Sequence, residues 1–387
     1  MRRPVKGYHQ STEIRRSYEI LPFQGVWTWL TGKELPERKP LWQSNSTERV
    51  LWSLSWVVVG VALTALSVFS LQNTAPINQL LCWLIGALFA TSGARYIVAT
   101  IIHHGVHGHL YKSQTVNKVL CEILSTLFIV QPYESYRQFH VYEHHGREFS
   151  TFDDKDLAAI YQLGFTPGKK KSALYTRLIL TLLSPKFHLV FFYGRLKSNL
   201  IGVPFYRLMM TLAWLATLGC VSYLLGVAGT VLILVLPFVV LYQMASLMHL
   251  ITEHVWLVRK EGESVRDSHI NNCLARFCGS ACPPDFSVKQ WGRWGKWAAM
   301  HLFVHLPSRM LIVQGSLVCH DWHHRFGSVR QWYDYAQLRE RHAQKLSAEE
   351  KYDYIDIWGV HNALDYVLSS LSEEQEVEIE HLAYRLN

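Results

Sequence analysis

Two long apolar blocks interrupt an otherwise mixed sequence, and each block is long enough for two membrane-spanning helices. The first runs over residues 51–71 and then, after a short uncharged turn, over 79–102. The second runs over 208–226 and then over 229–250. Crossing about 30 Å of hydrocarbon at 1.5 Å per residue takes roughly 20 residues, which each half-block supplies. The pattern therefore predicts two transmembrane hairpins, about four spans in all.

The segments that flank the first hairpin carry the basic residues that set its orientation. The connectors inside both hairpins hold no charge. By the positive-inside rule we expect every long segment and both termini to be cytoplasmic. The first fifty residues are polar, so no secretory signal peptide is expected. The basic residues are Arg2, Arg3, Arg15, Arg16, Lys39 and Arg49 before the hairpin, and Lys112, Lys118 and Arg137 after it.

The remaining segments are expected to form cytoplasmic helices. Between the hairpins, the apolar stretches of residues 103–207 are too short or too charged to span, and we expect them to lie at the membrane interface. Residues 347–387 alternate acidic and apolar positions at helical spacing, which predicts a solvent-facing helix pair. The expected fold is an all-α integral membrane protein in which a helical cytoplasmic cap carries the histidine clusters described below. Its parts are a cytoplasmic N-terminal segment (1–50), a membrane domain (51–330) and a cytoplasmic helical tail (331–387).

Composition narrows the class of protein further. Hydrophobic residues make up 49% and charged residues 18% of the chain, which is too apolar for disorder. The net charge is +8, but the Lys and Arg are scattered around apolar segments, so nucleic-acid binding is not expected. Seven cysteines, an odd number, argue against a disulfide framework. Cys273, Cys278 and Cys282 lack the paired spacing of a zinc site.

Three clusters among the twenty histidines carry the candidate chemistry. Residues three and four apart share one face of a helix, so each cluster presents its imidazoles in one direction. Imidazole suits Fe, Cu, Zn and Ni, and a set with few carboxylates disfavours Mg and Ca. An even number of predicted crossings separates the clusters, which places all of them on one face of the membrane. The clusters are His103 and His107; His140, His144 and His145; and His320, His323 and His324.

This arrangement resembles the membrane fatty acid desaturase and hydroxylase superfamily, whose histidine boxes follow H-x(3-4)-H, H-x(2-3)-H-H and (H/Q)-x-x-H-H. The resemblance covers roughly residues 90–330. It implies that eight box histidines and one further histidine hold two non-haem iron ions. Thr252-Glu253-His254 resembles the Glu-His element of the family, and residues 152–156 resemble its acidic stretch. The implied iron ligands are His103, His107, His140, His144, His145, His254, His320, His323 and His324.

The resemblance also implies an activity, namely O2-dependent desaturation of a lipid or fatty acyl substrate. The same histidines serve hydroxylation, so an oxygenase acting on a lipid, alkane, sterol or carotenoid remains the alternative. The two electrons must come from a separate ferredoxin or cytochrome-type donor, because the chain has no His-Pro-Gly-Gly haem motif. Two other classes of protein are disfavoured. A metal transporter would place its ligands near mid-membrane, and a structural zinc site would need only four histidines.

Several other histidines are weaker candidates. His301 and His305 repeat the four-residue spacing but match no box, so we do not expect them to bind metal. His104 and His109 flank the first cluster, and His249 precedes His254; we expect these to support ligands or end helices. The isolated histidines, His269 among them, are expected to be structural or exposed.

Overall fold

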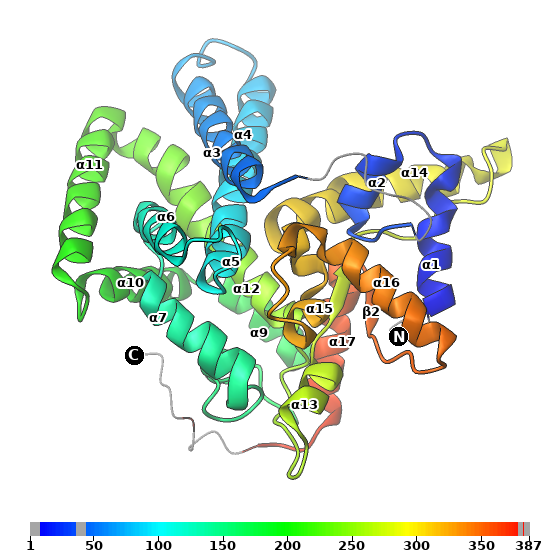
Figure 1. Ribbon diagram of the computed structural model, residues 1–387. Helices are drawn as coiled ribbons and strands as arrows, with labels where there is room; N and C mark the ends of the chain where they lie inside the picture. Colours follow the sequence, from blue (N-terminus) through cyan, green and yellow to red (C-terminus); the bar gives the residue numbers. More distant parts are fainter. Residues whose placement is uncertain (1–7, 36–43, 378–381, 383–387) are drawn as a thin grey trace. The chain divides into compact units, whose positions relative to one another are not determined.

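The structure is a computed structural model that describes residues 8–35, 44–377 and 382. The described chain is mostly helical (Figure 1). Its internal contacts divide it into two compact units. Unit 1 combines residues 1–43, 142–180 and 248–387, and unit 2 combines 44–141 and 181–247. Three of the basic residues used above to predict orientation (Arg2, Arg3 and Lys39) and both chain ends lie outside the described residues.

Unit 2 contains the first predicted hairpin, formed by α3 (Ser46–Phe69) and α4 (Pro76–Tyr96). Asn45 accepts a hydrogen bond from the Glu48 backbone and the Glu48 side chain accepts one in return, a reciprocal cap that begins α3 at Ser46. The two helices approach closely at glycines, since a Cβ on Gly86 would meet the Thr64 backbone at 2.7 Å. Small residues of this kind allow tight packing of helices without a water-driven hydrophobic effect.

Three described helices are long and apolar enough to cross a membrane. They are α3, the continuous helix Pro76–Val106 of 31 residues, and the 49-residue stretch Phe205–Glu253. The last is broken at Gly226, whose φ of 67° and ψ of 177° only glycine adopts readily. The break coincides with the turn expected between the third and fourth spans, although the number of crossings stays a prediction.

The rest of unit 2 is built from shorter helices. A buried ion pair lies among them: Arg207 Nη1 donates to Glu122 Oε2 over 2.7 Å. The interfacial stretches expected between the hairpins are helical, and they keep exposed apolar side chains such as Val119 and Leu189. The elements are η2 (Ile97–Ile102), α5 (His103–Val106), α6 (Gln114–Leu127), α7 (Tyr133–Arg137), α10 (Pro185–Leu200), α11 (Phe205–Gly229) and η4 (Thr230–Leu241).

Three elements run from one unit into the other along the chain, and the rest of the helices belong to unit 1. The shared elements are η3 (Gln138–Arg147), α9 (Lys171–Leu183) and α12 (Tyr242–Glu253). Unit 1 adds α1 (Tyr8–Arg16), η1 (Ser17–Ile20), α2 (Gln24–Thr31), α8 (Lys155–Gln162), α13 (Val265–Asn272), η5 (Val288–Gln290), α14 (Trp291–Met300), η6 (His301–His305), η7 (Ser308–Ile312), η8 (Gly315–Val318), α15 (His320–Arg325), η9 (Trp332–Asp334), α16 (Tyr335–Ala348) and α17 (Val360–Glu373).

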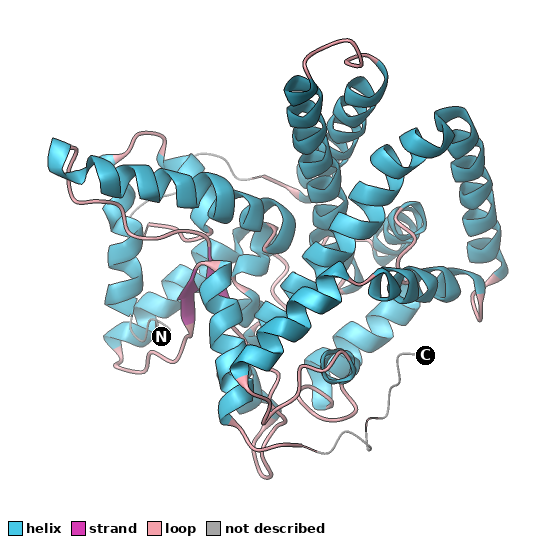
Figure 2. Ribbon diagram, turned by 180° about the vertical axis from the view of Figure 1, so that it is seen from behind, coloured by secondary structure: helices cyan, strands magenta, loops and turns pink. Residues whose placement is uncertain are grey.

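Unit 1 also contains a short parallel strand pair, which the sequence analysis did not predict. β1 (Ala275–Phe277) pairs with β2 (Asp356–Trp358), drawn in magenta in Figure 2. All six strand residues are buried. Three residues is too short for an alternation of apolar and polar positions to be recognised in a sequence. The pair joins the segment after α13 to the C-terminal tail, which places α15 and α16 in one compact unit.

The prediction of a solvent-facing helix pair over residues 347–387 was wrong for the part that the structure describes. Glu349 ends α16, and the following residues lead into β2 rather than into a helix. The next helix, α17, buries one complete side, including Val367, Leu368 and Leu371. The periodicity was recognised correctly, but its apolar stripe packs inside unit 1 instead of against a second surface helix.

Candidate metal centre

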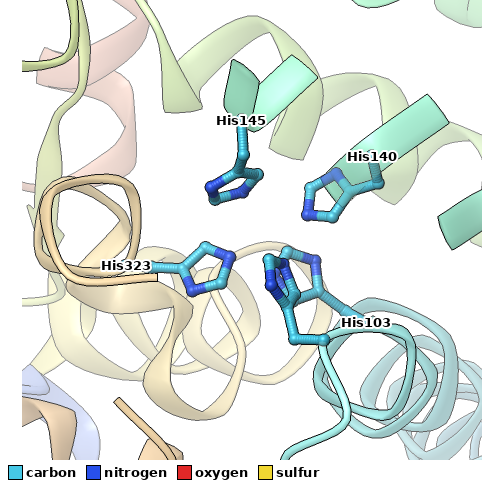
Figure 3. A group of neighbouring side chains, drawn as sticks. His103, His140, His145 and His323 are labelled. Atoms are coloured by element: carbon cyan, nitrogen blue, oxygen red, sulfur yellow. The ribbon is translucent and has the colours of Figure 1, made fainter. Parts of the chain in front are cut away.

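The first group of predicted ligands lies in unit 2 and comes from two helices. His103 begins α5, at the end of the long helix Pro76–Val106, and His107 caps α5. The ring of His140, from η3, lies 4.3 Å from the ring of His103 and 5.2 Å from that of His107. The ligand atoms of these three residues lie within 4.8 Å of one another. Figure 3 shows His103 and His140 with their rings turned toward each other.

A π-helix directly precedes the first cluster, and a second π-helix contains the second cluster. Residues Ile97–Ile102 form a π-helix directly before His103, and Gln138–Arg147 form a second one around His140, His144 and His145. In a π-helix the hydrogen bonds join residues five apart, so positions four and five apart share one side. The spacing of the second cluster therefore suits this geometry better than an α-helix. Such π-turns are rare and occur frequently at functional sites.

The second group of predicted ligands lies in unit 1, where His254, His320 and His324 converge. His320 Nε2 lies 3.1 Å from His254 Nε2 and 3.1 Å from His324 Nε2. Glu253 Oε2 lies 3.5 Å from the same His320 nitrogen. All four side chains are at least nine-tenths buried. Three imidazole nitrogens and a carboxylate oxygen are thus directed at one small volume.

The chemistry of this donor set fits a bound transition-metal ion. A neutral imidazole nitrogen carries either one hydrogen or one lone pair, so His320 Nε2 cannot bond favourably with two imidazoles and a carboxylate at once. A cation among these atoms would satisfy all of them together. The Nδ1 atoms of His254 and His324 are buried and make no hydrogen bond within the described residues. Iron is compatible with these nitrogen ligands, and no feature of the site excludes it.

Three further predicted ligands, His144, His145 and His323, complete the unit 1 group. The ring of His145 lies 4.5 Å from the ring of His323 and stacks on that of His324 at 4.0 Å. Figure 3 shows His145 and His323 facing each other from two different segments. His144 belongs with His254 and His324, since their ligand atoms lie within 4.8 Å of one another. Unit 1 therefore holds six of the nine predicted ligands and unit 2 holds three.

A carboxylate orients the ring of His144 through its Nδ1 atom. His144 Nδ1 lies 3.1 Å from both oxygens of Asp154, which belongs to the acidic stretch that the sequence analysis noted. Burial alone would lower the pKa of His144, but the charges of Asp154 and Asp156 outweigh it and raise that pKa to about 9. Carboxylates bonded to a ligand histidine in this way fix its tautomer and ring orientation.

The neighbouring imidazoles lack such an offset, so burial lowers their pKa values. The pKa values of His254 and His324 lie well below the ordinary range, and nearby histidines such as His144 lower that of His254 further. Burial also raises the pKa of Asp156 to about 7. Neutral imidazole is the form that binds a metal ion. The environment thus keeps His254 and His324 ready to act as ligands near neutral pH.

The third cluster is held in place by a buried charge network. Asp321, inside α15, accepts hydrogen bonds from Arg339 Nε at 2.9 Å and Arg339 Nη2 at 2.6 Å. The same Nη2 donates to Asp356 of β2 over 2.6 Å. All three side chains are at most 2% exposed. Because Asp321 is adjacent to His320 and two residues from His323, this network fixes the helix that presents both.

The weaker candidates occupy other positions, and none belongs to a metal-capable group within the described chain. His249 Nε2 lies 2.9 Å from Glu253, and its Nδ1 lies 2.6 Å from the Ile312 carbonyl oxygen. His301 uses both nitrogens, bonding Tyr18 and the Trp297 backbone. His104 and His109 lie beside the unit 2 group, where their rings are 6.4 Å apart.

Sequence reasoning missed two residues close to the unit 1 group. His269 was expected to be structural or exposed, yet its ring is buried 5.0 Å from that of His324 and 4.5 Å from that of Phe149. In the sequence His269 belongs to no histidine cluster and no family element, so nothing there indicated a position near the site. Arg339 was not singled out, because its contact with Asp321 joins residues that belong to different helices and share no motif.

Comparison with known proteins identifies one family. The family model described as "Fatty acid desaturase" matches residues 78–356, which include all nine predicted ligands. Among curated proteins, none matches the chain. The matched range is well over half of the sequence. It begins within α4 and ends at the first residue of β2.

Proposed function

We infer that this chain, which belongs to the fatty acid desaturase family of oxidoreductases, desaturates a lipid acyl chain with O2 at a histidine-held di-iron centre. The family implies a lipid substrate, O2 and membrane association. The observation that carries the proposal is the convergence of His254, His320 and His324, with nitrogen distances of 3.1 Å. Family membership together with a buried donor set of imidazoles and a single carboxylate favours iron over an oxygen-loving cation.

Nine histidines would hold the two iron ions in this proposal. Six belong to the unit 1 group and three to the unit 2 group, and η3 carries members of both. The count of two ions rests on the number of available imidazoles, since one ion needs no more than about six ligands. The proposed ligands are His103, His107, His140, His144, His145, His254, His320, His323 and His324.

Bound iron would supply the oxidising chemistry that removes hydrogen from an unactivated carbon, which amino-acid side chains cannot do. The residues of the chain would position its ligands. Asp154 holds the ring of His144 by its Nδ1 atom, which leaves Nε2 to face the centre. Glu253 lies between His249 and His320, so it is placed to hold a proton or to bind the metal directly. Burial of the group excludes bulk water from the reacting volume.

We also propose the membrane arrangement predicted from the sequence. Four spans in two hairpins, with the break at Gly226 as the outer turn of the second, would leave the active site and both termini in the cytoplasm. A separate ferredoxin or cytochrome-type protein would deliver the electrons. A tag placed after Asn387 should report a cytoplasmic location, and a report from the opposite side would refute this arrangement.

The test of the function combines metal analysis with lipid analysis. The purified chain should contain about two irons, and zinc as the native metal of an active preparation would refute the proposal. Lipids from cells that express the chain should gain double bonds detectable by mass spectrometry, and cells that express His323→Ala should not. Hydroxylated or ketone products instead would assign the chain to the oxygenases of the same superfamily.

A further inference from the structure

Residues 286–303 of unit 1 carry large apolar side chains that the fold leaves exposed. Phe286, Val288 and Trp291 are 60%, 72% and 65% exposed, and Leu302 and Phe303 are 56% and 73% exposed. No residue of α14, which forms the middle of this segment, is buried. A concentration of exposed apolar side chains of this size marks a surface that another phase or molecule covers.

The exposed side chains follow the helix on one side. Trp291, Gly295, Ala298 and Leu302 are spaced four, three and four residues apart, which is one stripe of a helix, and each is exposed. Phe303, beyond the end of α14, is exposed about a quarter to a third of a turn from this stripe.

The other side of the helix is held against unit 1. The ring of Trp297 stacks on His301 at 3.7 Å and lies 5.6 Å from the ring of Trp27 in α2. Trp297 also donates a hydrogen bond to the Ser280 carbonyl oxygen over 3.1 Å. The helix is therefore anchored on one side. The apolar stripe lies about a quarter to a third of a turn from the anchored side, and Phe303 lies roughly opposite the anchor.

Charge identifies what covers the stripe. Residues 286–320 contain no aspartate or glutamate. Lys289, Arg293 and Lys296 are exposed beside the apolar residues. Tryptophan and phenylalanine flanked by basic residues are typical of helices that lie in the headgroup region of a bilayer, where anionic lipids attract the positive charge. The described chain carries three helices long and apolar enough to cross a membrane, which would hold the protein at a bilayer.

We propose that residues 286–303 form an interfacial element that lies on an anionic membrane surface. Trp291, Leu302 and Phe303 enter the headgroup and upper acyl region, and the basic side chains contact lipid phosphates. Phe23, which directly precedes α2, and Val26 of α2 are exposed and extend the same contact, since Trp27 joins α2 to α14. The proposal is independent of the metal centre and concerns a surface outside the predicted spans.

The experiment uses the full chain in lipid nanodiscs with an environment-sensitive fluorophore attached at Phe303→Cys. The background is Cys82→Ser and Cys220→Ser, which removes the cysteines that are not buried. Lys345→Cys on α16, whose native side chain is 72% exposed, provides the matched control. We expect lipids brominated in their acyl chains to quench the label at 303 and aqueous iodide to leave it bright. The label at 345 should behave in the opposite way.

A second arm tests the charge. Discs of phosphatidylcholine with and without phosphatidylglycerol are compared for the 303 label, alone and combined with Lys289→Gln, Arg293→Gln and Lys296→Gln. We expect the anionic lipid to increase quenching, and each basic residue removed to reduce the ratio of inserted to free segment about fivefold.

Three outcomes would overturn the proposal. Iodide quenching at 303 equal to that at 345 would place the segment in water. Protection from both quenchers together with a dimeric assembly would assign the segment to a second copy of the chain. Equal behaviour in both lipid compositions would remove the anionic surface as its partner. Because neither iron nor activity enters the measurement, failure here leaves the proposed function untouched.

Discussion

Two histidine pairs in unit 1 have the same spacing and opposite surroundings. His320 and His324 are four residues apart, as are His301 and His305, and all four side chains are buried. The nitrogen of His320 faces two other imidazole nitrogens at 3.1 Å. His301 instead donates from Nδ1 to a backbone carbonyl over 2.8 Å, and its Nε2 lies 2.7 Å from the hydroxyl oxygen of Tyr18.

The contrast shows what spacing alone can and cannot indicate. Two positions four apart on a helix always present two side chains in one direction. A metal centre additionally requires ligands from other segments, which His254 supplies to His320 and no described residue supplies to His301. A carboxylate near the ligands, such as Glu253, is the second difference. The predictions below test this contrast.

The largest effect is expected when a proposed metal ligand is removed from the unit 1 group that contains His320 and His324. His323→Ala or His144→Ala should reduce lipid oxidation to below about 1% and should lower the iron content, because each removes a metal-binding nitrogen from a closed site. Iron per chain and product formation are measured together. His305→Ala is the matched control and should retain iron and most activity. Equal damage from His305→Ala would show that the ligand set is wrong.

The membrane-like helices were the part of the fold most accessible from sequence. Long apolar runs identified the helices α3 and Pro76–Val106 within a few residues, and the gap between 226 and 229 matches the break at Gly226. The strands β1 and β2 could not be predicted, because three buried residues leave no period to recognise. The prediction for residues 347–387 was wrong for a related reason. The helical period was clear, but a period does not show whether the apolar side of the helix packs against a second surface helix or inside the unit.

The candidate site likewise contains residues that the sequence could predict and residues that it could not. The clusters were found because ligands on one helix share a local spacing, and His254 was found through its resemblance to a family element. His269 and Arg339 were missed because their relation to the site is long-range, from α13 and α16 respectively. Only the folded chain brings His269 within 5.0 Å of the His324 ring. The nine ligands themselves stay a prediction until metal is measured.

A second test compares His254 with His249, which lie on either side of Glu253. His254→Ala should lose iron and activity together, because its Nε2 lies 3.1 Å from His320 Nε2. His249→Ala should be mild, with activity reduced no more than about tenfold, since it releases the Glu253 carboxylate and the Ile312 carbonyl oxygen but removes no nitrogen from a metal-capable group. Full iron content and near-normal turnover in His254→Ala would reduce the ligand set to eight.

A third test concerns the ion network behind α15. Arg339→Met leaves Asp321 and Asp356 buried without their main cation, which typically costs about 3–5 kcal/mol of stability. Arg207→Met breaks the equally buried pair with Glu122 in unit 2 and should cost a similar amount. Thermal unfolding measures both. Iron bound per folded chain should fall only in Arg339→Met; equal iron loss in the two variants would show that Arg339 has no special role in holding the third cluster.

The smallest effect is expected from the carboxylate that orients His144. Asp154→Asn keeps the shape of the side chain but removes the charge 3.1 Å from His144 Nδ1. In the iron-loaded protein, loss of such a partner should weaken metal binding about 10–100-fold without abolishing it. Competition with a chelator of known affinity measures this change.

The metal-free protein gives a sharper test through its pH dependence. The pKa of His144 is raised from 6.5 to about 9 in the folded chain, so its protonation stabilises the fold below about pH 6.5, and that stabilisation is lost as the pH rises through about 9. The raised pKa corresponds to on the order of 3 kcal/mol. A chain that retains Asp154 should therefore lose more stability than one with Asp154→Asn between these pH values in thermal unfolding. Groups remote from Asp154 are shared by the two proteins and cancel in the difference. Burial and the charge of Asp154 raise the pKa of Asp156 to about 7, so both proteins carry Asp156→Asn. Parallel curves for the two proteins would mean that Asp154 does not control the charge of His144.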